Sequence, residues 1–314
     1  MSDETICVIG VSGFIGSHVA AELLRRGYSV RGTLRNPEDK RDWLEAGLQP
    51  FATDDQTLSL HAANLRDQAS LEAAMEGCSG VVMSAGVEDQ EPDTVSLMLA
   101  AAANTLEAAD AVGIDRVVFT SSTGSCNPPG EEPAVKRELD HWSDPAQQIS
   151  VEKYSPAAKT LMERLAMGLG EKLGIRVCIM NPSLILGPAF QPDTPDSLAF
   201  LGKILRGERM GQRAPDGSMS IIHVDDLAAL HVSALEKDDA SGRYFGVKKS
   251  WHWQDILEAL DRVHPTYQAP DWPAGEERSE PTRYDLTRQD TLGVSVRGLD
   301  AILESAVDEL MARA

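Results

Sequence analysis

A glycine-rich turn close to the start of the chain restricts the possible folds more than any other feature of the sequence. The apolar run Ile6–Ile9 is typical of a buried strand, and the turn Gly10–Gly16 (GVSGFIG) leads from it into an amphipathic helix predicted over Ser17–Arg26. Glycines allow a tight turn and a close approach of a pyrophosphate, which the helix N-terminus attracts through its free N–H groups and its dipole. We therefore predict that this turn binds a dinucleotide through Gly10, Ser12, Gly13, Phe14, Ile15 and Gly16; a turn with only a structural role is the alternative.

The end of the second predicted strand, Ser29–Leu34, indicates which dinucleotide is bound. Chains that bind NAD usually carry Asp or Glu about 20 residues further on, where it accepts a hydrogen bond from the ribose 2′-hydroxyl. The segment Val30–Asn36 (VRGTLRN) contains no acidic residue, and Arg35 stands where its guanidinium would pair with a 2′-phosphate. The expected cofactor is NADP(H), unless Arg31 and Arg35 are ordinary surface charges.

Strand and helix patterns alternate along the first part of the chain. Further strands are predicted over Gly80–Met83, Arg116–Thr120 and Arg176–Met180. The predicted helices are Leu71–Met75, Leu97–Ala111 and Lys159–Leu173. Such alternation predicts an α/β fold with a doubly wound (Rossmann) parallel sheet and right-handed crossovers.

The composition shifts after Asn181 towards segments rich in Pro, Gly and charge, at residues 188–196, 207–217 and 265–281. A helix over Leu227–Leu235 is expected to return to the sheet. We therefore expect residues 1–181, with 222–247 returning to them, to form an NADP-binding domain. Residues 182–221 and 248–314 would form a smaller substrate-binding domain.

Composition and charge exclude several classes of partner. The chain has 29 Lys and Arg against 49 Asp and Glu, and its net charge of −20 argues against nucleic acid or an anionic membrane as a partner. No stretch approaches the ~20 apolar residues of a membrane span. The four cysteines lack the spacing of a metal site or of a disulfide framework. We expect a cytoplasmic protein with reduced thiols, no membrane contact and no bound metal.

Motifs along most of the chain resemble those of the extended short-chain dehydrogenase/reductases, in particular dihydroflavonol reductases, anthocyanidin reductases and related NADPH-dependent carbonyl reductases. Each motif is weakly specific alone, but together they are specific, and the chain beyond Val247 adds little. They are GVSGFIGS (10–17), VRGTLR (30–35), RVVFTSS (116–122), DHWSD (140–144), KTLME (159–163), NPSLILGP (181–188), HVDDL (223–227) and GRYF (242–245).

This resemblance implies a Ser-Tyr-Lys set of catalytic residues. Ser122 would hydrogen-bond the substrate carbonyl, and a tyrosine would donate a proton to its oxygen as hydride reaches the carbon. Lys159, identified by the KTLME pattern, would bind the nicotinamide ribose and lower the tyrosine pKa from about 10. The resemblance also implies Pro182 and Ser183 beside the nicotinamide. Asn127 would contact a hydroxylated substrate ring, or else stabilise its own loop.

The tyrosine does not match the family pattern cleanly. Residues four apart on a helix are offset by about 40°, whereas residues five apart are offset by about 140°. Ser155 lies four residues before Lys159, and Tyr154 lies five before it. One interpretation makes Ser155 the N-cap and Pro156 the first helical residue, so that Tyr154 precedes the regular helix and swings into place. In the other, Tyr154 packs elsewhere and Ser155 or a water replaces the acid.

The segment His223-Val224-Asp225-Asp226 suggests a metal or catalytic site at first sight. We expect a structural role instead, with Asp225 or Asp226 as N-cap of a helix that begins at Leu227, and with His223 as a structural histidine.

The residues together predict NADPH-dependent reduction of a small-molecule aldehyde or ketone, hydroxylated aromatic compounds included, by a monomer or homodimer. Two alternatives stay open at this point. The first is a nucleotide-sugar epimerase or dehydratase of the same superfamily, which would usually carry the acid that Arg35 replaces. The second is a non-catalytic NADP(H)-binding regulatory protein, which the displaced Tyr154 would suit.

Overall fold

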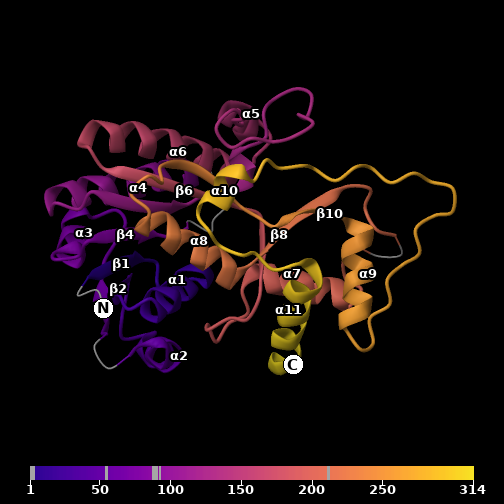
Figure 1. Ribbon diagram of the computed structural model, residues 1–314, viewed down its shortest axis with the longest axis horizontal. Coiled ribbons are helices and arrows are strands. Elements are labelled where there is room, and N and C mark those ends of the chain that lie inside the picture. Colours follow the sequence, from indigo (N-terminus) through magenta and orange to yellow (C-terminus); the bar gives the residue numbers. More distant parts are fainter. Residues whose placement is uncertain (1–3, 54–55, 87–90, 92, 211–212) are drawn as a thin grey trace.

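The computed structural model of the protein describes residues 4–53, 56–86, 91, 93–210 and 213–314, so part of the loop predicted over 207–217 lies outside the described residues. Its centre is a seven-stranded parallel sheet with helices on both faces, in the strand order β3-β2-β1-β4-β5-β6-β9 (Figure 1). This confirms the predicted doubly wound α/β fold. The strands are β1 (Thr5–Ile9), β2 (Ser29–Leu34), β3 (Leu58–Ala62), β4 (Gly80–Met83), β5 (Arg116–Thr120), β6 (Arg176–Pro182) and β9 (Gly242–Gly246).

The two faces of this sheet supply two separate cores because successive strand residues point to opposite sides. In β1, Ile6 and Val8 belong to one core, and Cys7 and Ile9 belong to the other. The first core is covered by α1 (Phe14–Arg25), α2 (Arg41–Leu48) and α8 (Val224–Glu236). The second is covered by α3 (Gln68–Met75), α4 (Thr94–Ala111) and α6 (Tyr154–Leu173). Burial on both faces explains why the strands are continuous apolar runs rather than alternating ones.

A second, three-stranded sheet in the order β10-β8-β7 forms a third core with the helices near the C-terminus (Figure 1). Its strands are β7 (Leu184–Leu186), β8 (Ser218–His223) and β10 (Lys249–His252), and its helices are α7 (Asp196–Leu205), α9 (Trp253–Val263) and α11 (Leu299–Arg313). The remaining short elements are η1 (Gln49–Phe51), η2 (Thr123–Ser125), α5 (Pro145–Ser150) and α10 (Thr287–Thr291). The division of the chain into two domains stays a prediction.

The order of the large sheet determines where a ligand can bind. The chain passes from β1 to β2 on one side and returns to β4 on the other side of β1. The strand order therefore reverses between β1 and β4, and doubly wound sheets hold their ligands at such a switch point, at the carboxyl ends of the strands.

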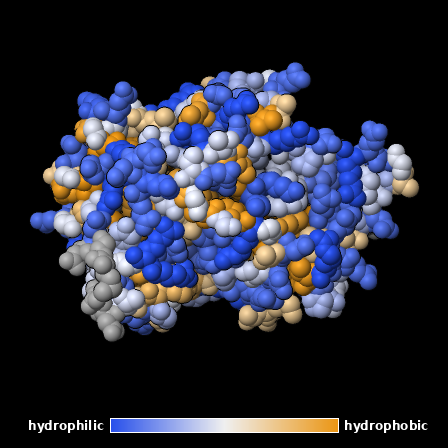
Figure 2. Space-filling model, in the orientation of Figure 1, coloured by the Kyte–Doolittle hydropathy of each residue, from blue (hydrophilic) through white to orange (hydrophobic). Residues whose placement is uncertain are grey.

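The surface is largely hydrophilic on the face that Figure 2 shows. Polar and charged residues cover most of the face shown in Figure 2, and apolar residues form small separate patches. Within the described part of the chain, no helix has the length and apolar character needed to cross a membrane.

Candidate active site

The glycine turn has a shape that only glycine permits. Gly10 has a φ of +83°, and a Cβ atom on it would lie 2.8 Å from the backbone of Ala85. A Cβ atom on Gly16 would lie 2.2 Å from the carbonyl oxygen of Gly10. Gly13 is the N-cap of α1, which therefore begins at Phe14 and not at Ser17 as predicted. The first N–H groups of α1 lack intrahelical partners, so the turn forms a cradle that fits a pyrophosphate.

Two basic residues follow β2 in the chain, and one of them contacts the glycine turn. Arg35 follows β2 and is exposed, and the Nζ of Lys40 lies 3.5 Å from the Oγ of Ser12 in the glycine turn. Sequence analysis predicted Arg35 but missed Lys40, because the intervening loop carries no pattern that places a lysine beside Ser12.

A second residue that sequence analysis missed, Gln191, also contacts the glycine turn. Gln191 follows β7, and its Nε2 donates to the carbonyl oxygen of Ser12 at 3.3 Å and to the Oγ of Ser17 at 3.0 Å. This contact joins segments more than 170 residues apart, and no local pattern predicts it.

Ser122 lies two residues after the end of β5, at the carboxyl edge of the sheet. It is the N-cap of η2, and its Oγ accepts a hydrogen bond from the N–H of Gly124 at 3.1 Å. The Nδ2 of Asn181 in β6 donates to the Ser122 carbonyl oxygen at 3.1 Å. Ser122 is only partly buried.

Lys159 lies on α6 and reaches the same edge of the sheet. Its Nζ donates to the carbonyl oxygen of Thr120, two residues before Ser122, at 2.8 Å. Burial lowers the pKa of Lys159 to about 8, against the opposing negative charge of Glu163. The hydroxyl of Thr120 lies 2.8 Å from the Nε2 of the fully buried His231, a residue that sequence analysis did not single out. The structure thus brings Lys159 and the Ser122 segment together.

Tyr154 is the first residue of α6, and Lys153 is the N-cap. The prediction that Ser155 caps this helix and Pro156 begins it was therefore wrong. Proline is tolerated at the third helical position because the first N–H groups of a helix have no intrahelical partner. Helical geometry then applies to Tyr154, which is offset from Lys159 by about 140°. Its half-buried hydroxyl has no hydrogen-bond partner among the described residues.

Asn127 is exposed on the loop after η2, and its side chain is already oriented. Its Oδ1 accepts from the Nζ of the buried Lys136 at 2.6 Å, while its backbone N–H donates to the Oγ of Ser143 at 2.9 Å. No described residue accepts a hydrogen bond from the amide NH₂ group of Asn127. Pro182 ends β6, and Ser183 follows it with its Oγ 3.7 Å from the Sδ of Met219.

The segment around His223 forms a helix cap. Helix α8 begins at Val224, and the Nδ1 of His223 accepts from the N–H of Asp225, so the prediction of an Asp cap and a start at Leu227 was wrong. Burial and the positive charge of Arg297 lower the pKa of His223 to about 4, which keeps its ring neutral. Asp225 instead lies 2.7 Å from the Nδ1 of His18 on α1.

The chain matches known proteins over most of its length. Residues 6–246 match the model of the NAD dependent epimerase/dehydratase family. The chain is 33% identical over 307 residues to cinnamoyl-CoA reductase 1 of Oryza sativa subsp. japonica, which covers 97% of this chain and 89% of that protein. It superposes on vestitone reductase from alfalfa (Medicago sativa) with a TM-score of 0.82, at 26% identity over 98% of both chains. Gre2 of Candida albicans in complex with NADPH gives a TM-score of 0.83 at 21% identity, over 99% of both chains, which shows a shared fold.

Proposed function

Because the chain belongs to the NAD dependent epimerase/dehydratase family, whose members are extended short-chain dehydrogenases/reductases, we propose that it reduces a small-molecule aldehyde or ketone to an alcohol. The chain is an NADP-dependent oxidoreductase. Its similarity to reductases and the motifs in its sequence both support this. One observation carries the proposal: the ammonium group of Lys159 is held at the carbonyl oxygen of Thr120, beside Ser122, at the edge of the sheet that faces the glycine turn.

The cofactor is NADP(H), and the described residues fit it. The turn at Gly10 and Gly16 would hold the pyrophosphate at the N-terminus of α1. A Cβ atom at either position would collide with the backbone that gives the turn its shape. Arg35 and Lys40 would pair with the 2′-phosphate. When bound, NADPH supplies the hydride. The absence of an acid at the end of β2 disfavours the epimerases and dehydratases of the family, which usually carry one there.

Three side chains would act on the substrate carbonyl. The Ser122 hydroxyl would donate a hydrogen bond to the carbonyl oxygen and orient it, and Tyr154 would donate the proton that this oxygen takes up. Lys159 would hold the nicotinamide ribose and favour ionisation of the tyrosine through its positive charge. For this role the Tyr154 ring must turn towards Lys159, since a regular helix sets the two residues on different faces. Ser155, one turn before Lys159, is the alternative donor site.

The loop after Ser122 bears on substrate choice. The amide NH₂ group of Asn127, on the loop that follows Ser122, is a hydrogen-bond donor that would suit a substrate with a hydroxyl or a second oxygen. This supports hydroxylated aromatic carbonyl compounds as the first substrates to try.

The decisive test is consumption of NADPH with a panel of aliphatic, aromatic and hydroxylated aromatic aldehydes and ketones, with NADH as comparison. Turnover with NADPH, and alcohol formed in equal amount, supports the proposal. Tight NADPH binding without turnover on any carbonyl would instead support a non-catalytic NADP(H)-binding protein. The helical offset of Tyr154 from Lys159 favours that second candidate.

A further inference from the structure

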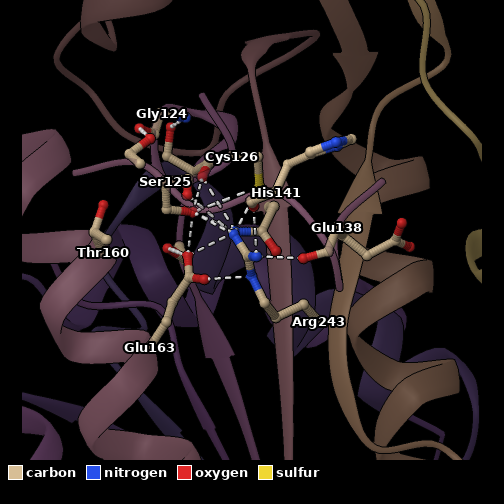
Figure 3. A network of polar contacts seen from close by, with 12 residues as sticks. Gly124, Ser125, Cys126, Glu138, His141, Thr160, Glu163 and Arg243 are labelled. Carbon is tan, nitrogen blue, oxygen red and sulfur yellow. Dashed lines mark hydrogen bonds and ion pairs between the residues drawn. The ribbon is translucent and has the colours of Figure 1, made fainter. Parts of the chain in front are cut away.

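A fully buried ion pair joins Arg243 and Glu163 (Figure 3). The Nε of Arg243 on β9 lies 2.6 Å from the Oε2 of Glu163 on α6, and neither side chain is exposed to solvent. Removing two charges from water costs more than their attraction returns unless further hydrogen bonds satisfy both groups. The partners of each group therefore show what the pair holds in place.

Glu163 binds the segment that carries Ser122. Its Oε1 accepts from the hydroxyls of Ser121 and Ser125 and from the Nδ2 of Asn181, the last at 2.7 Å. Ser121 and Ser125 lie on either side of Ser122 in the sequence, and Asn181 also donates to the Ser122 carbonyl oxygen. Glu163 is one helical turn after Lys159, so a single carboxylate connects the serine segment to the lysine helix.

Arg243 binds the loop that follows Ser122. Its Nη1 donates to the carbonyl oxygens of Glu138 and of His141, the second at 2.9 Å. Its guanidinium carbon lies 3.7 Å from the centre of the Trp142 ring. Its Nη2 donates to the carbonyl oxygen of Ser125 at 3.2 Å. The planar fork of arginine thus spans three segments at once, which the single nitrogen of a lysine could not do.

We propose that Glu163 and Arg243 are positioning residues of the reductase site: Glu163 sets Ser122 against Lys159, and Arg243 holds the 138–142 loop over the substrate. This inference rests on the proposed function for its kinetic effects. Neither residue touches the reacting atoms; both act through the groups that they hold.

The first experiment uses Glu163→Gln, which keeps the shape of the side chain and removes its charge. The negative charge of Glu163 raises the pKa of Lys159 towards its usual value, so the substitution should lower that pKa below about 8. If Lys159 acts as an ammonium, activity is lost as pH rises through its pKa. The alkaline limb of the kcat profile should therefore move to lower pH by about 0.5–1 unit. Glu163→Asp keeps the charge and should leave the limb in place.

The second experiment uses Arg243→Lys, which keeps the charge and loses the fork. We expect faster hydrogen–deuterium exchange of the amides of residues 138–142, measured without substrate, and a KM for the carbonyl raised about 10-fold, with the alkaline limb unchanged. The matched control is Arg262→Lys, because Arg262 pairs with Asp300 on the exposed surface. This control should change neither exchange over 138–142 nor KM.

The two proposals fail in different ways. Lack of turnover by the unsubstituted protein would refute the proposed function but leave the exchange measurement to decide the role of Arg243. Native exchange over 138–142 in Arg243→Lys would overturn the loop assignment. If Glu163→Gln folds, as shown by its circular dichroism, and the alkaline limb of its kcat profile stays at the original pH, Glu163 is not a positioning residue. If it does not fold, the Arg243→Lys measurements decide alone.

Discussion

The buried ammonium group of Lys159 should lower the free energy of unfolding, so a substitution that removes this group should stabilise the protein. Burial lowers the pKa of Lys159 from 10.5 to about 8. At about 1.36 kcal/mol for each pKa unit, the ammonium disfavours the folded state by about 3 kcal/mol at neutral pH. Lys159 keeps some solvent exposure, and screening makes this figure an upper limit. Lys159→Met removes the charge but leaves the Thr120 carbonyl oxygen unpaired, which costs about 1 kcal/mol.

We therefore expect Lys159→Met without cofactor to be more stable than the unsubstituted protein by up to about 2 kcal/mol near pH 7. The sign follows from linkage: the folded-state pKa is depressed, so the cost is fully present below the folded pKa of about 8. It fades as pH rises towards the unfolded value of 10.5. Urea unfolding at several pH values between about 7 and 10 measures this, and the advantage of Lys159→Met should shrink over that range.

The matched control for this measurement is Lys172→Met, since Lys172 is exposed near the end of the same helix. It should change the free energy of unfolding by less than about 0.5 kcal/mol at every pH. A Lys159→Met variant less stable than the unsubstituted protein at pH 7, or an advantage independent of pH, would refute the argument from burial.

Three further substitutions test the proposed site. Gly16→Ala should weaken NADPH binding at least about 100-fold, measured by fluorescence titration, because its Cβ atom would displace the Gly10 carbonyl. The control is Gly168→Ala, whose Cβ atom would meet open space and which should bind NADPH normally. Arg35→Ala should weaken NADPH binding by about 10- to 100-fold and leave NADH binding unchanged, since only NADPH carries the 2′-phosphate; equal losses for both would contradict the assignment. Tyr154→Phe should lower kcat by about 10²–10⁴, with little effect of Ser155→Ala, and the reverse pattern would move the proton donor to Ser155.

The fold could be predicted from the sequence because its signals are local. A strand with both faces buried is a continuous apolar run, and the alternation of such runs with helices admits few topologies. The glycine turn is equally local, since the positive φ of Gly10 and the close contact at Gly16 demand glycine whatever lies elsewhere. Helix starts were less certain. The side chains in the first turn of a helix need not follow the helical spacing of apolar residues. Prediction from that spacing therefore placed the starts of α1 and α6 too late in the sequence.

The sequence by itself predicted β1, β2, β4, β5 and β6 and the glycine turn, because each depends on a pattern within a few residues, but it did not predict β3 or β9. Local motifs also picked out Ser122 and Lys159 as candidate site residues. Only the tertiary structure decided what surrounds them. Lys40 reaches Ser12 across a loop, His231 meets Thr120 from another helix, and Arg243 meets Glu163 from a distant strand. These contacts join segments whose separation in the sequence carries no period. They form because burying a polar group requires a partner, and the fold alone determines which partner is within reach.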